Sequence, residues 1–242
     1  MHLSVIIPAY NEEKRLPNTL RSVNDYLCRQ SFDYEILVVD NGSKDKTAQV
    51  VREMAGEMKE LALIQGFSGR GKGFAVKKGM MAAKGDFRIF VDADNSTSID
   101  QIEKMWPEFE KGADIVIGSR DVKGAVLDPP QPWLRNAVLG EGFKLYRKLI
   151  IGLWKIQDTQ CGFKCFTGKA AEQIFPKCRI NHFAFDPEVL VIAEKCGYRI
   201  KEVPVYWKND LDSKVNFKGI IKMALDMVKI RCNLIVGKYR LN

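Results

Sequence analysis

The sequence predicts an α/β protein built on an open, mostly parallel β-sheet with helices on both faces. In the first half of the chain, short apolar runs alternate with longer segments whose apolar residues recur every three to four positions, which is the rhythm of successive β-α units. Several apolar runs are followed at once by small or acidic residues, as expected where parallel strands end at a ligand-binding edge. With 242 residues, the chain is long enough for one well-packed core.

Two β-α units are predicted at the start of the chain. The first helix has apolar residues along one face, at Leu16, Leu20, Val23 and Leu27. A turn at residues 41–43 precedes the second helix, and Ser43 or Asp45 is placed to cap it. The predicted elements are a strand over residues 3–8, a helix over 12–29, a strand over 34–40 and a helix ending at residue 58.

The remaining elements are less regular toward the end of the chain. The proline-rich segment 128–132 predicts a stiff, extended loop. The predicted strands cover residues 61–65, 88–92, 115–119 and 199–205, and the predicted helices cover 74–83, 133–154 (strongly apolar), 168–174, 187–196 and 216–239.

Residues 89–94, IFVDAD, form the most informative motif. Side chains alternate along a strand, so Asp92 and Asp94 point the same way and Ala93 leaves room between them. Two carboxylates that close together are costly unless a divalent cation lies between them or one takes a proton. A Mg²⁺ or Mn²⁺ ion bound there would bridge to substrate phosphates. An isolated Asp-X-Asp is usually a solvated turn, but the buried strand before it favours a ligand site.

Four loops that follow predicted strands carry residues suited to a nucleotide. After the first strand, Tyr10 can flank a base and Glu12 can accept hydrogen bonds from ribose hydroxyls. After the second strand, Asp40 can accept a hydrogen bond from the imide N–H of uracil. The third loop, GFSGRGKG at residues 66–73, exposes backbone N–H groups and adds Lys72, and the fourth loop is the Asp-Ala-Asp motif. Four such loops in order are a far stronger signal than one.

The third loop also fits the P-loop string G-x-x-x-x-G-K, at Gly66, Gly71 and Lys72. A P-loop needs Ser or Thr after the lysine to hold Mg²⁺, and Gly73 occupies that position. A P-loop ATPase is therefore disfavoured.

The positive charge of the chain lies in its second half. The net charge is +8; residues 1–120 contain 17 basic and 18 acidic residues, whereas residues 121–242 contain 21 and 12. This excess indicates a polyanionic partner, such as a membrane surface or nucleic acid. Lys and Arg interleaved with aromatic residues on exposed strands, the pattern of single-strand binding, are not seen, so nucleic acid is not expected.

Cysteines and apolar runs limit the other possibilities. The six cysteines are scattered and the chain has two histidines, so we expect reduced thiols rather than a zinc site or a disulfide framework. The N-terminus enters a strand without a charged n-region, so no signal peptide is expected. No run reaches about 18 uninterrupted apolar residues, so no membrane-spanning helix is expected.

Taken in order, SVIIPAYNEE, VVDNGSKD, GRGKG and VDAD resemble the family 2 glycosyltransferases with the GT-A (Rossmann-like) fold. In the second half, DTQCGFKCF (158–166), FAFDPEVL (183–190) and SKVN (213–216) resemble the dolichyl- and polyprenyl-phosphate glycosyltransferases, and most of all the dolichyl-phosphate β-glucosyltransferase branch. The resemblance covers nearly the whole chain.

The resemblance implies a role for each matching residue on the donor side. Lys72 would contact the diphosphate or the sugar, and Asp92 and Asp94 would organise the nucleotide and a Mg²⁺ or Mn²⁺ ion as catalytic and metal-binding residues. Related mannosyl enzymes have a glutamine where this chain has Ser96, so a third protein ligand is not expected and water would take its place. Asn41 replaces a more usual Asp. The implied nucleotide-sugar-binding residues are Pro8, Ala9, Tyr10, Glu12, Asp40, Gly71, Lys72, Asp92 and Ala93.

On the acceptor side, the resemblance implies that Arg120, with Arg135 and Lys214, holds the acceptor phosphate. For Arg135 and Lys214, a plain surface cation is an almost equal alternative. Asp158 would position the acceptor or approach the anomeric centre, and structural support of its loop is nearly as well favoured.

Two regions follow from this interpretation: a GT-A domain over residues 1–215, with the apolar helix at about 133–154 on its acceptor side, and a basic amphipathic helix over 216–242. The final helix aligns Ile221, Leu225, Val228, Cys232, Ile235 and Val236 on one face. It is expected either to lie in a membrane interface or to pack as an ordinary surface helix. The first alternative predicts a peripheral or monotopic protein on the cytoplasmic face of a membrane.

The expected activity is inverting, metal-dependent transfer of a sugar from a UDP-sugar, with UDP-glucose favoured, to dolichyl or polyprenyl phosphate. Transfer from GDP-mannose is the alternative, because guanine also presents N–H donors to Asp40. A non-catalytic basic module that binds membranes or nucleic acid is the alternative of another class, and it leaves the Asp-Ala-Asp motif unexplained.

Overall fold

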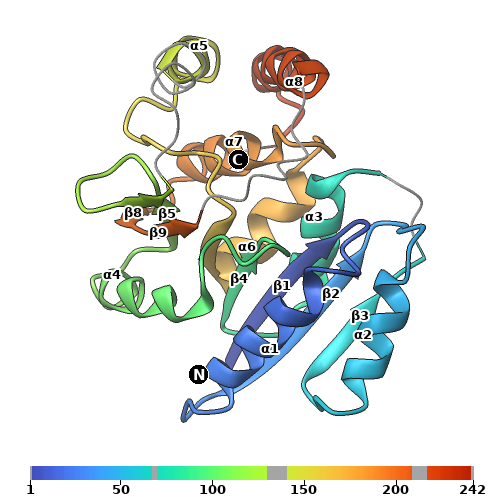
Figure 1. Cartoon of the computed structure of the whole chain (residues 1–242). Coiled ribbons are helices and arrows are strands. Elements are labelled where there is room, and N and C mark those ends of the chain that lie inside the picture. Colours follow the sequence, from blue (N-terminus) through green and yellow to red (C-terminus); the bar gives the residue numbers. More distant parts are fainter. Residues whose placement is uncertain (1, 67–69, 130–140, 209–216, 241–242) are drawn as a thin grey trace.

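The computed structural model describes residues 2–66, 70–129, 141–208 and 217–240, and its central element is an open sheet (Figure 1). Seven strands lie in the order β3-β2-β1-β4-β7-β5-β8. Neighbouring strands are parallel except where β7 pairs with β4 and β5. The strands are β1 (His2–Ala9), β2 (Asp33–Asp40), β3 (Leu61–Ile64), β4 (Phe87–Val91), β5 (Ile115–Ser119), β7 (Phe163–Thr167) and β8 (Ile200–Pro204).

Helices cover both faces of this sheet, and each face has its own hydrophobic core. One core packs beneath α1, where Leu16, Leu20, Val23 and Leu27 are buried as the apolar spacing predicts. On that face lie α1 (Leu16–Leu27), α2 (Thr47–Ala55), the 3₁₀ helix η1 (Ile99–Lys104) and α4 (Trp106–Glu110). On the other lie α3 (Lys72–Ala82), α6 (Gly168–Ile174), the 3₁₀ helix η3 (Phe175–Lys177) and α7 (Phe185–Lys195). The predicted α/β fold class is confirmed.

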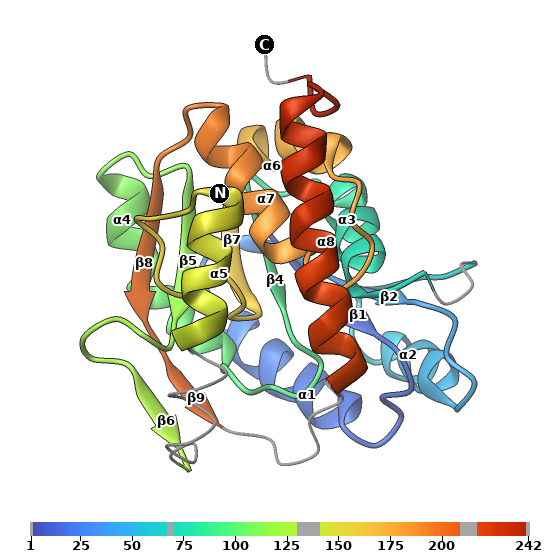
Figure 2. The ribbon, with the colours of Figure 1, turned by 90° about the horizontal axis from the view of Figure 1, so that it is seen from above.

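Two further helices form an outer layer beyond α7. α5 (Glu141–Ile151) and α8 (Phe217–Ile235) lie side by side, as Figures 1 and 2 show. The Tyr146 hydroxyl of α5 donates a hydrogen bond to the Ala224 carbonyl of α8 at 3.1 Å. Among the described helices, none is both long and apolar enough to cross a bilayer.

The largest difference from the sequence-based prediction is β7. Residues 158–163, DTQCGF, are expected as a loop and no strand is predicted after them, yet residues 163–167 form an antiparallel strand in the middle of the sheet. The apolar run there is only five residues long and contains Lys164, which conceals its strand character. A small parallel sheet of β6 (Val126–Asp128) and β9 (Tyr206–Lys208) was also not predicted.

Several helix boundaries differ by a few residues, each for a local reason. α1 begins at Leu16 rather than residue 12, with a proline in its first turn. α5 ends at Ile151 rather than residue 154 because Gly152, at φ +82°, terminates it; residues 133–140 of the predicted helix lie outside the described part. α8 ends at Ile235, just before Gly237 at φ +68°. α7 starts two residues earlier than predicted.

Candidate active site

The strand ends that were expected to carry ligand-binding residues meet at one edge of the sheet. Ala9 at the end of β1 is paired with Asp40 at the end of β2, and the Asn41 N–H donates to the Ala9 carbonyl at 2.9 Å. β4 lies on the other side of β1 and leads into Asp92. Parallel strands place the loops after β1, β2 and β4 together, so the predicted grouping of these loops is confirmed by the sheet order.

Asp92 is held between Lys72 and Gly162. Lys72, the first residue of α3, forms an ion pair with the Asp92 carboxylate. Gly162 precedes β7 and lies against the same carboxylate so closely that a Cβ atom there would overlap it. A side chain at position 162 would displace the Asp92 carboxylate, a consequence that no local sequence pattern reveals.

The charges around Lys72 favour its protonated form. Burial opposes the charged ammonium, but the Asp92 carboxylate, and then that of Asp186, raise the pKa of Lys72. Lys72 is therefore a fixed positive charge beside the Asp-Ala-Asp motif, at the N-terminus of α3. That position suits a group that binds phosphate oxygens.

Asp94 is the second carboxylate of the motif. Its Oδ1 accepts a hydrogen bond from the Ser96 N–H at 3.0 Å. Burial, and then the neighbouring charge of Asp92, raise the pKa of Asp94. The site thus carries more negative charge than Lys72 balances, which favours a bound cation.

The donor set fits a hard divalent cation better than a metal held entirely by protein. Within the described residues, no three His, Cys, Asp or Glu side chains gather into a metal-binding group. Asp92 and Asp94 therefore offer at most two ligands, both carboxylates. Mg²⁺ typically takes one or two carboxylates and completes its octahedral shell with water and substrate phosphates, and Mn²⁺ likewise prefers oxygen ligands.

A buried ion pair lies close to this motif and was not assigned from the sequence. The Lys164 ammonium is fully buried on β7, and it donates to Asp186 Oδ1 on α7 at 2.6 Å. It also lies 5.2 Å from the centre of the Phe90 ring. Burial raises the pKa of Asp186, against the opposing charge of Lys164. The pair ties β7 to the start of α7, and a lysine inside an apolar run was the only local signal for it.

The donor-side residues lie in loops that are braced against one another. Asp40 is buried and its Oδ1 accepts hydrogen bonds from the Ser43 N–H at 3.0 Å and from the Ser43 hydroxyl at 2.5 Å. Glu12 is paired with Arg15 at 2.8 Å. Tyr10 is an exposed residue, with 42% of its surface accessible.

The glycine-rich loop approaches the loop after β2 and the segment before α7. The Arg70 N–H donates to the Asn41 side-chain oxygen at 3.1 Å. Gly71, at φ +106°, packs so tightly against the backbone of Asn181 that a Cβ atom would overlap it. Asn41 therefore supports the glycine-rich loop.

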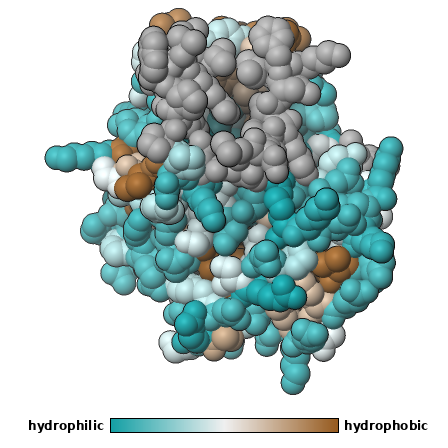
Figure 3. All heavy atoms as spheres, viewed as in Figure 1, coloured by the Kyte–Doolittle hydropathy of each residue, from teal (hydrophilic) through white to brown (hydrophobic). Residues whose placement is uncertain are grey.

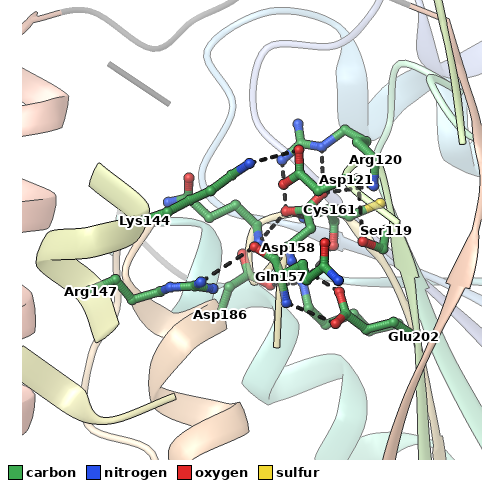
Figure 4. A network of polar contacts seen from close by, with 12 residues as sticks. Ser119, Arg120, Asp121, Lys144, Arg147, Gln157, Asp158, Cys161, Asp186 and Glu202 are labelled. Carbon is green, nitrogen blue, oxygen red and sulfur yellow. Dashed lines mark hydrogen bonds and ion pairs between the residues drawn. The ribbon is translucent and has the colours of Figure 1, made fainter. Parts of the chain in front are cut away.

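Arg120 and Asp158, which were predicted on the acceptor side, form a doubly hydrogen-bonded ion pair (Figure 4). The guanidinium donates from Nε to Asp158 Oδ2 at 2.7 Å and from NH2 to Oδ1 at 3.0 Å. Although burial opposes ionisation, the Arg120 charge holds the pKa of Asp158 well below its usual range. Arg120 also lies 4.8 Å from the Trp207 ring centre. The other two residues expected at the acceptor phosphate, Arg135 and Lys214, lie outside the described residues.

The chain is similar to known proteins along most of its length. Residues 4–175 match the Glycosyl transferase family 2 domain. A dolichyl-phosphate beta-glucosyltransferase of Trichomonas vaginalis is 39% identical over 95% of this chain and 71% of its own length. The enzyme of the same description from Dictyostelium discoideum is 37% identical over 100% of this chain and 77% of its own.

Among solved structures, glucosyl-3-phosphoglycerate synthase from Mycobacterium tuberculosis, in a complex with Mn²⁺, UDP and glucosyl-3-phosphoglycerate, has a similar fold. Its TM-score is 0.66 over 96% of this chain and 80% of that chain, at 16% identity. At this identity, the likeness concerns the fold alone.

Proposed function

Because this chain belongs to glycosyl transferase family 2, we propose that it transfers glucose from UDP-glucose to dolichyl phosphate, or a related polyprenyl phosphate, at a membrane surface. The observation that carries the proposal is the meeting of the Asp-Ala-Asp motif, Lys72 and the loops after β1 and β2 at one sheet edge. Relatives described as dolichyl-phosphate beta-glucosyltransferases support the choice of glucose and of the lipid acceptor.

The proposed reaction is a single in-line displacement. An oxygen of the lipid phosphomonoester attacks the anomeric carbon while the bond from that carbon to UDP breaks, so an α-linked donor gives a β-linked lipid product. The acceptor is already anionic at neutral pH. Its oxygen therefore needs little help from a general base.

The residues of the chain bind and orient the two anionic substrates. Lys72 faces the position proposed for the donor diphosphate, and Arg120, whose carboxylate partner fixes its orientation, faces the acceptor side. Asp92 and Asp94 would hold a divalent cation, which neutralises charge on the leaving diphosphate when it is bound. Asp158 is proposed to keep Arg120 in place.

Donor identity is the most direct test of the proposal. Purified protein should form a glucosylated lipid from UDP-glucose, Mg²⁺ or Mn²⁺ and a short dolichyl phosphate, because the similarity to dolichyl-phosphate beta-glucosyltransferases favours this donor. The measurement is identification of the lipid product by mass spectrometry, with GDP-mannose as the competing donor. Turnover of GDP-mannose without turnover of UDP-glucose would favour the mannosyl alternative. Absence of transfer from every donor would favour a non-catalytic module.

The outer helices support membrane docking. α8 packs through Met223, Met227 and Ile230, whereas the apolar face noted in the sequence points outward. Figure 3 shows hydrophobic residues at the upper rim of the molecule, where Figure 1 places α5 and α8. The large apolar side chains exposed there are Leu145, Leu149, Ile221, Leu225, Val228, Ile235 and Val236. We propose that this surface, called here the α5–α8 face, rests on the cytoplasmic leaflet.

Reversal of two lysines on α8 tests this docking. Lys222 and Lys229 are exposed, and each basic residue near an anionic leaflet contributes about 1 kcal/mol. Lys222→Glu with Lys229→Glu should therefore weaken binding to anionic vesicles by roughly thirtyfold or more. UDP affinity should not change. Cosedimentation with vesicles is the measurement.

The matched control reverses one exposed lysine of α6 and one of α7, Lys169→Glu with Lys195→Glu, which gives the same net charge. Equal vesicle binding by the α8 variant and the wild type would show that the α5–α8 face does not dock. Equal loss in both variants would show that only net charge matters.

A further inference from the structure

A hollow of about 420 Å³ opens beside α5, and three of its six lining residues are lysines. It belongs to neither the donor side nor the Asp-Ala-Asp motif. Its lining residues are Asp121, Lys144, Lys148, Trp154, Lys155 and Gln157.

The chain builds this hollow from two segments that fold back on each other. Lys144 and Lys148 are four residues apart on α5, so they share one side of the helix. Gly152 then ends the helix, with its N–H bonded to the Lys148 carbonyl at 2.9 Å. The turn brings Trp154 and Lys155 back beside the last helical turn, where both are exposed.

The charges of the hollow are only partly balanced. Lys144 is paired with Asp121 at 2.9 Å, which neutralises one of the three lysines (Figure 4). Among the described residues, neither Lys148 nor Lys155 forms an ion pair. The hollow therefore presents two uncompensated ammonium groups to a ligand, together with the Gln157 side chain.

The position of the hollow indicates where its ligand comes from. Asp121 directly follows Arg120, and Gln157 directly precedes Asp158, so the wall of the hollow continues into the Arg120–Asp158 pair. On its outer side, Trp154 is 59% exposed, and Leu145 and Leu149 of the α5–α8 face are exposed as well. Lysines beside an exposed tryptophan and exposed leucines are typical of a site at the level of lipid headgroups.

We propose that this hollow binds the terminal phosphomonoester of a membrane lipid, with Lys148 and Lys155 as its cations. A phosphomonoester carries a charge of about −1.5 to −2 at pH 7 and has three terminal oxygens, so it can meet both ammonium groups at once. A phosphodiester, by contrast, carries one negative charge, and two of its four oxygens are esterified to carbon. The acceptor lipid phosphate and phosphatidic acid share the monoester chemistry.

The inference rests on the proposed docking of the α5–α8 face, and the test separates the two. Phosphatidylcholine vesicles are prepared at one surface potential with phosphatidic acid, dolichyl phosphate or phosphatidylglycerol. The wild type should bind the two monoester vesicles roughly tenfold more tightly than the diester vesicles, because the added charge meets two lysines. The double variant Lys148→Ala with Lys155→Ala should lose this preference. The control variant Lys169→Ala with Lys195→Ala removes the same charge elsewhere. The two variants should bind the diester vesicles about equally.

If the Lys148→Ala, Lys155→Ala variant loses its preference only for the dolichyl phosphate vesicles, the hollow binds the acceptor lipid. If it loses its preference only for the phosphatidic acid vesicles, the hollow binds bulk phospholipid. UDP affinity, measured by calorimetry, confirms that the variants are folded. An unchanged monoester preference in the variant, or no preference in the wild type, would overturn the proposal while docking stands. Failure of the wild type to bind any of the vesicles would overturn the docking itself.

Discussion

Replacement of Asp94 by alanine is expected to lower glucose transfer by roughly a hundred- to a thousandfold, because a carboxylate that holds a cation against the leaving diphosphate has no substitute nearby. Among the described residues, no third side chain of ligating type joins Asp92 and Asp94. The same substitution should weaken binding of Mn²⁺ in the presence of UDP. Calorimetric titration of Mn²⁺ measures this without turnover, and excess EDTA should reproduce the loss of transfer in the wild type.

Asp86→Ala is the matched control for this experiment. Asp86 is an exposed carboxylate at the opposite end of β4, just before the strand begins at Phe87. Its removal takes away one negative charge from the same strand but should leave Mn²⁺ binding and transfer within about twofold of the wild type, as for most surface substitutions. Full transfer by Asp94→Ala, or by the wild type in EDTA, would contradict the metal assignment of both carboxylates.

The parts of the fold that were predictable are those encoded over short distances. β1, β2 and β4 each contain a short run of apolar residues, and α1 shows its buried face at helical spacing, so their type follows from the residues themselves. Because parallel strands end at a common edge, the loops that follow them could be grouped as one candidate site. The assignment of Asp92 and Asp94 draws on this reasoning, on their spacing after a buried strand and on the resemblance to the family.

The parts that were not predictable depend on contacts between distant residues. β7 contains a lysine, and the buried Lys164 ammonium is satisfied by partners outside the strand, chiefly the Asp186 carboxylate of α7 at 2.6 Å. Likewise, Gly162 appears to be an ordinary loop glycine until its contact with Asp92 is known. Neither pairing has a local signature, since each joins elements that are separated along the chain.

The sequence could not show which face of α8 is exposed, for a different reason. The helix has apolar residues on two sides: Met223, Met227 and Ile230 are buried, while Ile221, Leu225 and Val228 are exposed. Periodicity identifies an apolar face but does not say which of two such faces meets the domain. Only the packing of α8 against α5 and α7 separates them.

Asp158→Ala is expected to produce the largest loss of stability, about 3–5 kcal/mol in the free energy of unfolding, because it leaves the Arg120 guanidinium without its buried partner. The Asp158 side chain is 3% exposed. It also accepts backbone N–H bonds from Gln160 at 2.9 Å and Cys161 at 3.2 Å, so the loop loses its bracing as well. For a chain of this size, Tm should fall by roughly 6–20 °C in scanning calorimetry.

The control for this loss is an exposed pair. Lys111 and Glu108 are 2.7 Å apart at the surface, and Glu108→Ala should cost about 1 kcal/mol or less after solvent screening.

The Arg120–Asp158 pair also sets how the stability of the protein depends on pH. Since the pKa of Asp158 is lowered in the folded state, its contribution to stability is fully present above the ordinary carboxyl pKa and is lost only in strong acid.

A double-variant cycle then separates support of Arg120 from a direct role of Asp158 in transfer. Arg120→Gln and Asp158→Asn each leave one uncompensated charge, so the double variant should lose much less stability than the sum of the two single losses. If Asp158 acts only by holding Arg120, the double variant should also transfer glucose no more slowly than Arg120→Gln alone, at a temperature well below every Tm. A further loss of transfer in the double variant, with unchanged affinity for UDP, would instead assign Asp158 to the reacting groups. Additive losses of stability would show that the two side chains do not act as an energetic unit, despite the bonds of 2.7 and 3.0 Å between them.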